Sequence, residues 1–183
     1  MANEYRINNF KISFKLQYYS RRCLSRLLSR HASRITLFAN FSVLRSSVFV
    51  YTLFESGHVN CTKISDVTSI GRAILHLLRL FPGRGHRHRT PKVIGLSLDN
   101  ISAHGTLWES SKFLAKVKRH LKAKYGLDSQ YNPQKFPGLS VRINGTTFVL
   151  FQNGKFLAVG SKSTKLLKEN YTTFRNYVAS VPP

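Results

Sequence analysis

The sequence predicts an α+β protein in which two copies of one unit each place helices on one face of an antiparallel sheet. This prediction rests on an internal repeat, on tight hairpin turns and on amphipathic helices. In the repeat, three pairs of residues are each 97 positions apart: Arg45 and Arg142, Phe54 and Phe151, and Gly57 and Gly154. A strand-like run precedes each copy and a helical run follows it. A period close to half the chain length indicates a duplicated unit.

The hairpin signals are clearest between residues 136 and 162. Two runs of β-branched or aromatic residues, Ser140–Ile143 and Thr146–Phe151, are separated by Asn144-Gly145, a dipeptide typical of tight hairpin turns. Asn153-Gly154 supplies a second turn, because both residue types tolerate positive φ, and Phe156–Val159 follows as a third strand. We therefore predict three antiparallel strands in this stretch.

The first half predicts the order strand, helix, several strands, helix. Apolar and polar residues alternate along Tyr5–Tyr18, which is typical of a strand with one buried face. After Ser20, three leucines at helical spacing predict a helix, and Asp66 is expected to cap a second one. The helical stripes are Leu24, Leu27 and Leu28, then Ile70, Ile74, Leu77 and Leu78; the strands are Ile35–Phe41, Val43–Arg45, Val48–Phe54 and a run through Thr62.

The second half repeats this order after a break. Prolines, glycines and basic residues in Phe81–Lys92 predict a connection, so we divide the chain into a first repeat (1–81), a basic linker (82–92) and a second repeat (93–183). Beyond the three strands above, we expect a strand over Val93–Ala103, helices from about Trp108 to Lys124 and Ser163 to Val178, and a loop at Tyr131-Asn132-Pro133.

The charge of the chain points to a polyanionic partner. Among 183 residues there are 29 Lys+Arg and 7 Asp+Glu, giving +22, and both halves are basic. At 42% hydrophobic, the chain can still bury a core, so it is not a disordered basic tail. Nucleic acid is the simplest partner for such a field. A basic surface kept for solubility and an anionic membrane surface are the alternatives, but no apolar run has the length of a membrane span.

Catalytic and metal-binding chemistry finds little support in the sequence. The two cysteines, Cys23 and Cys61, form neither a disulfide framework nor a zinc cluster, and this usage is typical of a reducing compartment. His86 and His88 have no carboxylate or thiol nearby and are interpreted as part of a solvated basic loop. The acids are scattered and no glycine-rich phosphate loop follows a strand. We therefore predict a protein that is not an enzyme and holds no cofactor or metal.

Several segments together resemble the TATA-box-binding protein (TBP) family, and the resemblance covers nearly the whole chain. Tyr131–Arg142 (YNPQKFPGLSVR) resembles that family's motif YxPxxFPGLxxR, and Leu150–Lys162 (LFQNGKFLAVGSK) resembles its strand IFxSGKxxxTGAK. Leu53–Lys63 matches the same strand more loosely, while Ile7–Leu16 and Ser97–Leu107 resemble the strand that opens each family repeat. The resemblance implies a two-repeat saddle, with a curved antiparallel sheet and helices on its convex face.

Members of this family bind the DNA minor groove with the concave sheet and kink it with paired phenylalanine wedges. Carried over by position, Phe136 and Phe151 match one wedge pair, and Phe54 matches one wedge of the other pair. Asn9 and Asn100 match the asparagines that donate hydrogen bonds to minor-groove acceptors. The remaining positions implied to face DNA are Thr62, Arg142, Leu157 and Val159, together with the departures Lys11, Asn60 and Ser102. Ordinary structural roles, a core phenylalanine or a polar residue at a strand end, stay open for Phe54 and the two asparagines.

The departures from the family pattern predict a divergent member, of the kind expected in a virus or a reduced lineage. The first-half counterpart of Phe136 falls on Ala39, between Phe38 and Phe41, so that wedge is expected to be displaced or lost. Lys11, Asn60 and Ser102 stand where the family has valine on the DNA-facing sheet. Polar groups there place selectivity for TATA sequences in doubt, and lysine near phosphates adds affinity without sequence information. The partner-binding loop, acidic in the family, carries Asn132, Gln134 and Lys135 here.

The sequence therefore predicts a general transcription initiation factor that binds and bends A·T-rich promoter DNA and nucleates the assembly of general transcription factors and RNA polymerase. Its expected place is the nucleus or another site of transcription, such as a viral factory. One alternative keeps the fold but assigns the chain to replication, repair or packaging as a nucleic-acid-binding appendage. Another is a basic RNA-binding structural protein, against which the apolar set Phe136, Phe151, Leu157 and Val159 argues.

Overall fold

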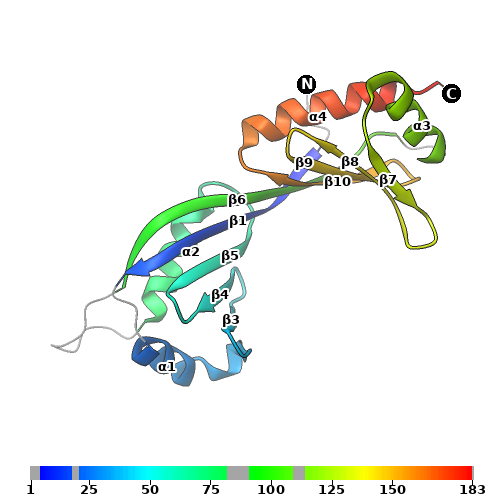
Figure 1. Ribbon diagram of the computed structural model, residues 1–183. Helices are drawn as coiled ribbons and strands as arrows, with labels where there is room; N and C mark the ends of the chain where they lie inside the picture. Colours follow the sequence, from blue (N-terminus) through cyan, green and yellow to red (C-terminus); the bar gives the residue numbers. More distant parts are fainter. Residues whose placement is uncertain (1–4, 18–20, 82–90, 109–113, 183) are drawn as a thin grey trace. The chain divides into compact units, whose positions relative to one another are not determined.

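The computed structural model describes residues 5–17, 21–81, 91–108 and 114–182. These residues form four α-helices and a ten-stranded sheet with the order β2-β3-β4-β5-β1-β6-β10-β9-β8-β7 (Figure 1). All of the strand pairs for which a register is available are antiparallel. The predicted α+β class, helices with an antiparallel sheet, is thus confirmed.

The chain divides into two compact units, which we call the N-terminal unit (residues 9–99) and the C-terminal unit (residues 1–8 and 100–183). Two long strands, β1 and β6, contribute residues to both. This division differs from the repeats predicted at 1–81 and 93–183, because each repeat gives part of its opening strand to the other unit. The predicted linker lies mostly outside the described residues, and Lys92 already begins β6.

The N-terminal unit contains the first strands and helices of the chain. They are β1 (Tyr5–Gln17, from Asn9), α1 (Arg21–Arg30), a short 3-10 turn (Ala32–Arg34), β2 (Ile35–Leu37), β3 (Phe41–Arg45), β4 (Val50–Phe54), β5 (His58–Ile64), α2 (Ser69–Leu80) and the start of β6 (Lys92–Thr106). As predicted, Phe10, Ile12 and Phe14 of β1 are buried. The buried Tyr51 of β4 donates its hydroxyl to the Ala73 carbonyl oxygen (2.8 Å), which ties α2 to the same face of the sheet.

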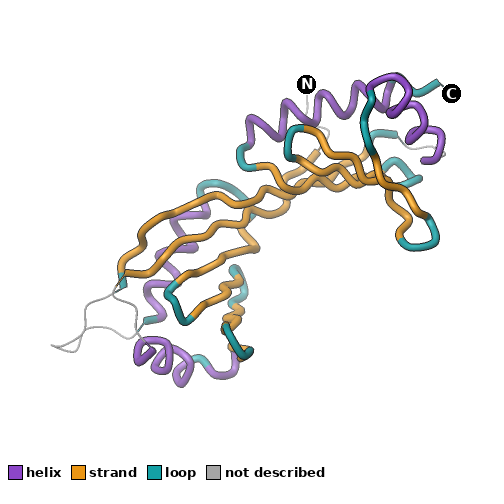
Figure 2. Tube along the Cα trace, viewed as in Figure 1, coloured by secondary structure: helices purple, strands orange, loops and turns teal. Residues whose placement is uncertain are grey.

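The C-terminal unit contains the rest of β6, α3 (Leu114–Tyr125), β7 (Ser129–Asn132), β8 (Phe136–Ile143), β9 (Thr146–Leu150), β10 (Lys155–Ser161) and α4 (Thr164–Ala179). Figure 2 shows α4 running along the strands of this unit. Its Phe174 ring stacks on Phe148 of β9, with centroids 4.3 Å apart, and also contacts Phe156 of β10. The side chain of Asn170, buried on α4, donates a hydrogen bond to Thr146 Oγ1 (2.8 Å), so this buried amide has a hydrogen-bond partner.

Several element boundaries differ from the prediction; β6, for example, runs to Thr106 rather than Ala103. The strand predicted over Ile35–Phe41 stops at Leu37, and Phe41 opens the next strand, because a turn closed by the Phe38 N–H and the Phe41 carbonyl oxygen (2.9 Å) lies between them. That turn contains no glycine or proline, so the sequence carries no strong turn signal there. The loop predicted at residues 131–133 is strand until Asn132. The following strand begins at Phe136 rather than Ser140, because Asn132 pairs directly with Phe136.

Candidate nucleic-acid interface

In both units the strands alternate between buried residues facing the helices and accessible residues on the opposite side, which we call the open face. In β8, for example, Leu139, Val141 and Ile143 are buried, whereas Ser140 and Arg142 are accessible. Because side chains alternate strictly along a strand, these accessible residues share one face. On the open face of the C-terminal unit lie Asn100, Ser102, His104, Phe136, Ser140, Arg142, Thr147, Val149, Phe151, Leu157 and Val159.

The C-terminal unit brings the predicted phenylalanine pair together. The rings of Phe136 and Phe151 meet edge to face, with centroids 6.0 Å apart, and Phe136 is 49% exposed. Gly138 makes room for this arrangement: a Cβ there would lie 2.6 Å from Phe136 Cε1 and 2.6 Å from Val149 Cγ1. The Phe136 ring therefore lies over the backbone at Gly138 and remains half accessible, which is unusual for a core phenylalanine.

Leu157 and Val159 continue an apolar surface next to this pair. Both are accessible, at 41% and 37%. In the strand register Leu157 lies beside Val149 on one side and His104 on the other, and Val159 lies beside Thr147. Val149 and Thr147 were not among the residues predicted from the sequence, although strand alternation from Phe151 could have found them. The C-terminal open face thus carries an accessible apolar patch made of Phe136, Val149, Phe151, Leu157 and Val159.

The N-terminal unit presents a more polar open face. Asn60 and Thr62 of β5 lie on it, as predicted, and Asn60 is paired with Thr52 of β4 and Ser13 of β1. Lys11 alternates with the buried Phe10 and Ile12, so it shares this face. At the position of Leu157 in the other unit stands Asn60, because the two are 97 residues apart. Equivalent strands of the two units, β5 and β10, therefore carry polar residues on the open face of the N-terminal unit where the C-terminal unit carries apolar ones.

The N-terminal unit has an aromatic pair of its own, in which Ala39, the counterpart of Phe136, takes no part. Ala39 lies in the turn between β2 and β3, whereas Phe41 lies directly opposite Phe54, with ring centroids 5.9 Å apart. Phe38, half exposed, stacks on Phe41 at 4.6 Å. By the 97-residue offset, Phe41 occupies the position of Gly138. In the C-terminal unit the Phe136 ring lies over Gly138. In the N-terminal unit the equivalent position is Phe41 itself, so its aromatic pair is formed by Phe41 and Phe54.

The two predicted asparagines perform the same task in the two units. Each accepts a hydrogen bond through Oδ1 from a bulged backbone amide: Lys63 N–H donates to Asn9 (2.8 Å), and Gly160 N–H donates to Asn100 (2.5 Å). Lys63 and Gly160 are equivalent in the repeat, and both have positive φ, 65° and 96°. With Oδ1 held, the amide group of each asparagine is oriented with its N–H donors away from the bulge. Asn100 Nδ2 makes a long contact with Ser102 Oγ (3.4 Å).

The remaining predicted residues lie at the margin. Arg142 is exposed on the open face beside Thr147. In the predicted partner-binding loop, Asn132 uses its side chain locally, accepting the Gln134 N–H (3.2 Å), while Gln134 and Lys135 are exposed. These residues form a tight turn between β7 and β8, so Gln134 and Lys135 are presented to solvent. Their role as a partner-binding site stays a prediction.

Comparison with known proteins gives matches to TATA-box-binding proteins. Residues 110–181 match the family model described as "Transcription factor TFIID (or TATA-binding protein, TBP)". The TATA-box-binding protein of Thermoplasma volcanium is 30% identical over 121 residues, which cover 64% of this chain and 61% of that protein. For the TATA-box-binding protein of Pyrobaculum neutrophilum the values are 27% over 115 residues, 62% and 54%.

The chain is therefore similar to TATA-box-binding proteins, at a distance. It matches about three fifths or less of the length of these relatives. A solved structure, Methanococcus jannaschii TBP, aligns with a TM-score of 0.73 over 98% of this chain and 100% of that chain at 22% identity. This likeness confirms the TBP-like fold predicted from the sequence.

The TATA-box-binding protein family is a family of transcription factors and not of enzymes, as predicted for this chain. Three titratable groups of the N-terminal unit that lie close together, Tyr51, Cys61 and His76, have shifted pKa values. Burial raises the pKa of the Cys61 thiol to about 12, and burial, then Cys61, raises the pKa of Tyr51. Burial lowers the pKa of His76, whose Nδ1 lies 2.9 Å from Tyr51 Oη. Within the described residues, no group of three His, Cys, Asp or Glu could hold a metal ion. None of the described helices has the length and apolarity needed to cross a membrane.

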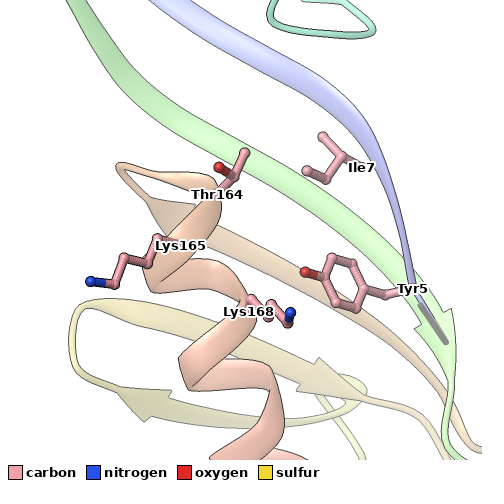
Figure 3. Close-up of a pocket in the computed structure, with 5 residues that line it drawn as sticks. All are labelled: Tyr5, Ile7, Thr164, Lys165 and Lys168. Atoms are coloured by element: carbon pink, nitrogen blue, oxygen red, sulfur yellow. The ribbon is translucent and has the colours of Figure 1, made fainter. Parts of the chain in front are cut away.

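Three hollows of the C-terminal unit include residues of α3 or α4 in their lining and none of the open-face residues named above. One of about 510 Å³ lies between the first residues of β1 and the start of α4, lined by Tyr5, Ile7, Thr164, Lys165 and Lys168 (Figure 3). The Tyr5 ring stands between the strand and the helix, where it also packs on Tyr171 with centroids 4.7 Å apart. We call this hollow the α4 hollow.

Proposed function

We propose that this chain binds promoter DNA in the minor groove through the open face and bends it, as an initiation factor that recruits the transcription machinery. The observation that carries the proposal is the accessible apolar surface of the C-terminal unit, with Phe136 and Phe151 paired at 6.0 Å. Apolar side chains inserted between base steps unstack them and kink the duplex, and a phenylalanine pair half open to solvent suits that task.

The chemistry of the open face supports the minor groove rather than the major groove. The minor groove offers mostly hydrogen-bond acceptors, N3 of adenine and O2 of thymine, and it is narrower than the major groove, which admits an α-helix. Asn9 and Asn100 supply amide donors whose oxygens are already held by Lys63 and Gly160. Leu157 and Val159 supply accessible apolar contacts without charge. We therefore expect a preference for A·T-rich duplex.

The two units contribute differently to this proposed function. The C-terminal unit supplies apolar contact and the Phe136/Phe151 wedge, whereas the N-terminal unit places Lys11, Asn60 and Thr62 on its open face. Lysine near the backbone adds affinity that depends on salt and not on sequence. We therefore expect weaker sequence selectivity under the N-terminal unit. Its wedge is formed by Phe41 with Phe54, in place of the lost phenylalanine at Ala39.

The partners and cellular site follow as part of the same proposal. The exposed Gln134 and Lys135 belong to the turn through which a general transcription factor would join the chain to RNA polymerase. Since the acids of the family loop are absent here, the bridging factor is expected to be equally divergent. The site of action is then the nucleus or another site of transcription, such as a viral factory. Binding of the usual bridging factor with unchanged affinity would count against this divergence.

The proposal is tested by DNA bending, measured by fluorescence transfer on end-labelled duplexes, A·T-rich against G·C-rich, at two salt concentrations. Two double variants, Phe136→Ala with Phe151→Ala and Phe41→Ala with Phe54→Ala, separate the wedges. We expect a sharp bend on the A·T-rich duplex, lost in the first variant and reduced in the second. Binding without bending, equal for all sequences and abolished by salt, would mean that the basic surface alone holds DNA.

A further inference from the structure

The helices of the C-terminal unit carry a large positive charge that DNA on the open face would not neutralise. Together α3 and α4 hold eight lysines and arginines but a single acid, Glu169. Both helices pack against the sheet through buried apolar residues, among them Leu121 of α3 and Phe174 of α4. Their charged side chains therefore point away from the sheet, on the side opposite to Phe136 and Leu157. The positive charge on this side therefore suits an anionic partner other than DNA bound to the open face.

A groove with a regular construction lies on the outer side of α3, and we call it the α3 groove. It has a volume of about 540 Å³ and is lined by Ala115, Lys118, Arg119, Lys122, Ala123 and Tyr131. The five helical positions follow the spacing i, i+3, i+4, i+7 and i+8, so they form one continuous stripe along the helix. Tyr131 closes the groove from β7, the edge strand of the sheet.

The α3 groove combines cations with an apolar floor. Ala115 and Ala123 end at Cβ, and their short side chains leave the space that the groove occupies. The Lys118, Arg119 and Lys122 side chains provide the positive charge, and Tyr131 provides an aromatic wall. Lys122 is also bonded to Asp128 (2.5 Å), which lies outside the lining. No acid is among the lining residues, and Asp128 pairs with only one of the three cations, so the groove keeps a net positive charge.

We propose that the α3 groove binds an acidic amphipathic helix of a partner protein. The apolar side chains of such a helix would fill the space over the two alanines and against Tyr131, while its carboxylates would meet Lys118, Arg119 and Lys122. A nucleic acid backbone would use the cations but has no group suited to the alanine floor, which is why the groove favours a protein. This proposal goes beyond DNA bending and does not depend on it.

The test uses a fluorescein-labelled helical peptide built from Glu and Leu at i, i+4 spacing, titrated with the full chain and followed by fluorescence anisotropy. One variant, Lys118→Glu with Lys122→Glu, reverses the charge of the groove. A second, Ala115→Leu with Ala123→Leu, fills the floor but keeps every charge. We expect each to weaken peptide binding by roughly tenfold or more, the first through charge and the second through shape.

The matched control is Lys165→Glu with Lys168→Glu, which makes the same charge change in the α4 hollow. We expect this control to bind the peptide within about twofold of the unchanged chain. Equal loss in both charge-reversed variants would overturn the proposal, since it would mean attraction to net charge alone. Unchanged binding in the leucine variant would overturn it as well. A labelled DNA duplex titrated in parallel should bind the leucine variant normally; loss of duplex binding there would assign the groove to nucleic acid instead.

Discussion

Replacing Phe136 by alanine tests how much of the proposed DNA affinity comes from one exposed ring. The side chain is 49% exposed. A phenylalanine buries roughly 200 Å² when fully enclosed, so about 100 Å² remains for a ligand to cover. At about 25 cal/mol per Å², covering it contributes about 2.5 kcal/mol to binding, equivalent to roughly a 60-fold change in Kd. Phe136→Ala should therefore weaken binding to an A·T-rich duplex by about this factor.

The assay is an anisotropy titration of a labelled duplex at fixed salt, well below the unfolding temperature. That precaution is needed because the covered half of the ring packs beside Phe151, and its loss also lowers the stability of the fold. Leu75→Ala is the control, since Leu75 is similarly exposed, at 53%, but lies on α2 of the helix side. If Phe136→Ala bound within about threefold of the unchanged chain, an apolar wedge at this position would be refuted.

Three further predictions concern the amide donors, the interior and the turns. Asn100→Asp keeps the oxygen that accepts the Gly160 N–H of the bulge but removes the N–H donors. Denaturant titration should therefore show an unchanged fold, while duplex binding should fall at least ~10-fold. Normal duplex binding would exclude Asn100 as a donor to DNA. Because burial lowers the pKa of His76, the free energy of unfolding should be highest above pH 6.5, the ordinary pKa of histidine, and should decline as pH falls through the lower pKa of the folded state. In unfolding experiments at several pH values, His76→Gln should flatten this dependence; an unchanged slope would count against the role of His76. Gly154→Ala places a Cβ against the Trp108 carbonyl oxygen at φ 79° and should lower the free energy of unfolding by at least ~2 kcal/mol. Gly145→Ala should cost less, because Gly145 has positive φ but open space around it; equal midpoints of the two variants in thermal unfolding would contradict the clash.

The contrast between the two aromatic pairs shows how far local sequence signals reach. Phe136 and Phe151 lie in motifs that resemble those of the TBP family, and that resemblance implied their pairing. Phe41 has no such signal. Its neighbour across the sheet depends on a turn at residues 38–40 that lacks glycine and proline, and on the register that this turn sets between β3 and β4.

By itself the sequence determined the features that are written in local patterns. The 97-residue repeat, the Asn-Gly turns, the alternation of β1 and the helical stripes depend on neighbouring residues only, and they predicted the α+β class and most of the elements. The resemblance of Ser97–Leu107, Tyr131–Arg142 and Leu150–Lys162 to the TBP family added the positions of Asn100, Phe136 and Phe151.

Only the tertiary structure decided what distant residues do together. It placed the Asn9 and Asn100 oxygens on the bulged amides of Lys63 and Gly160, and it opposed Phe41 to Phe54. It also gathered the α3 stripe and Tyr131 into one groove. Each of these depends on strand register and helix packing, which join residues across long separations in the chain, and no local preference encodes such distances.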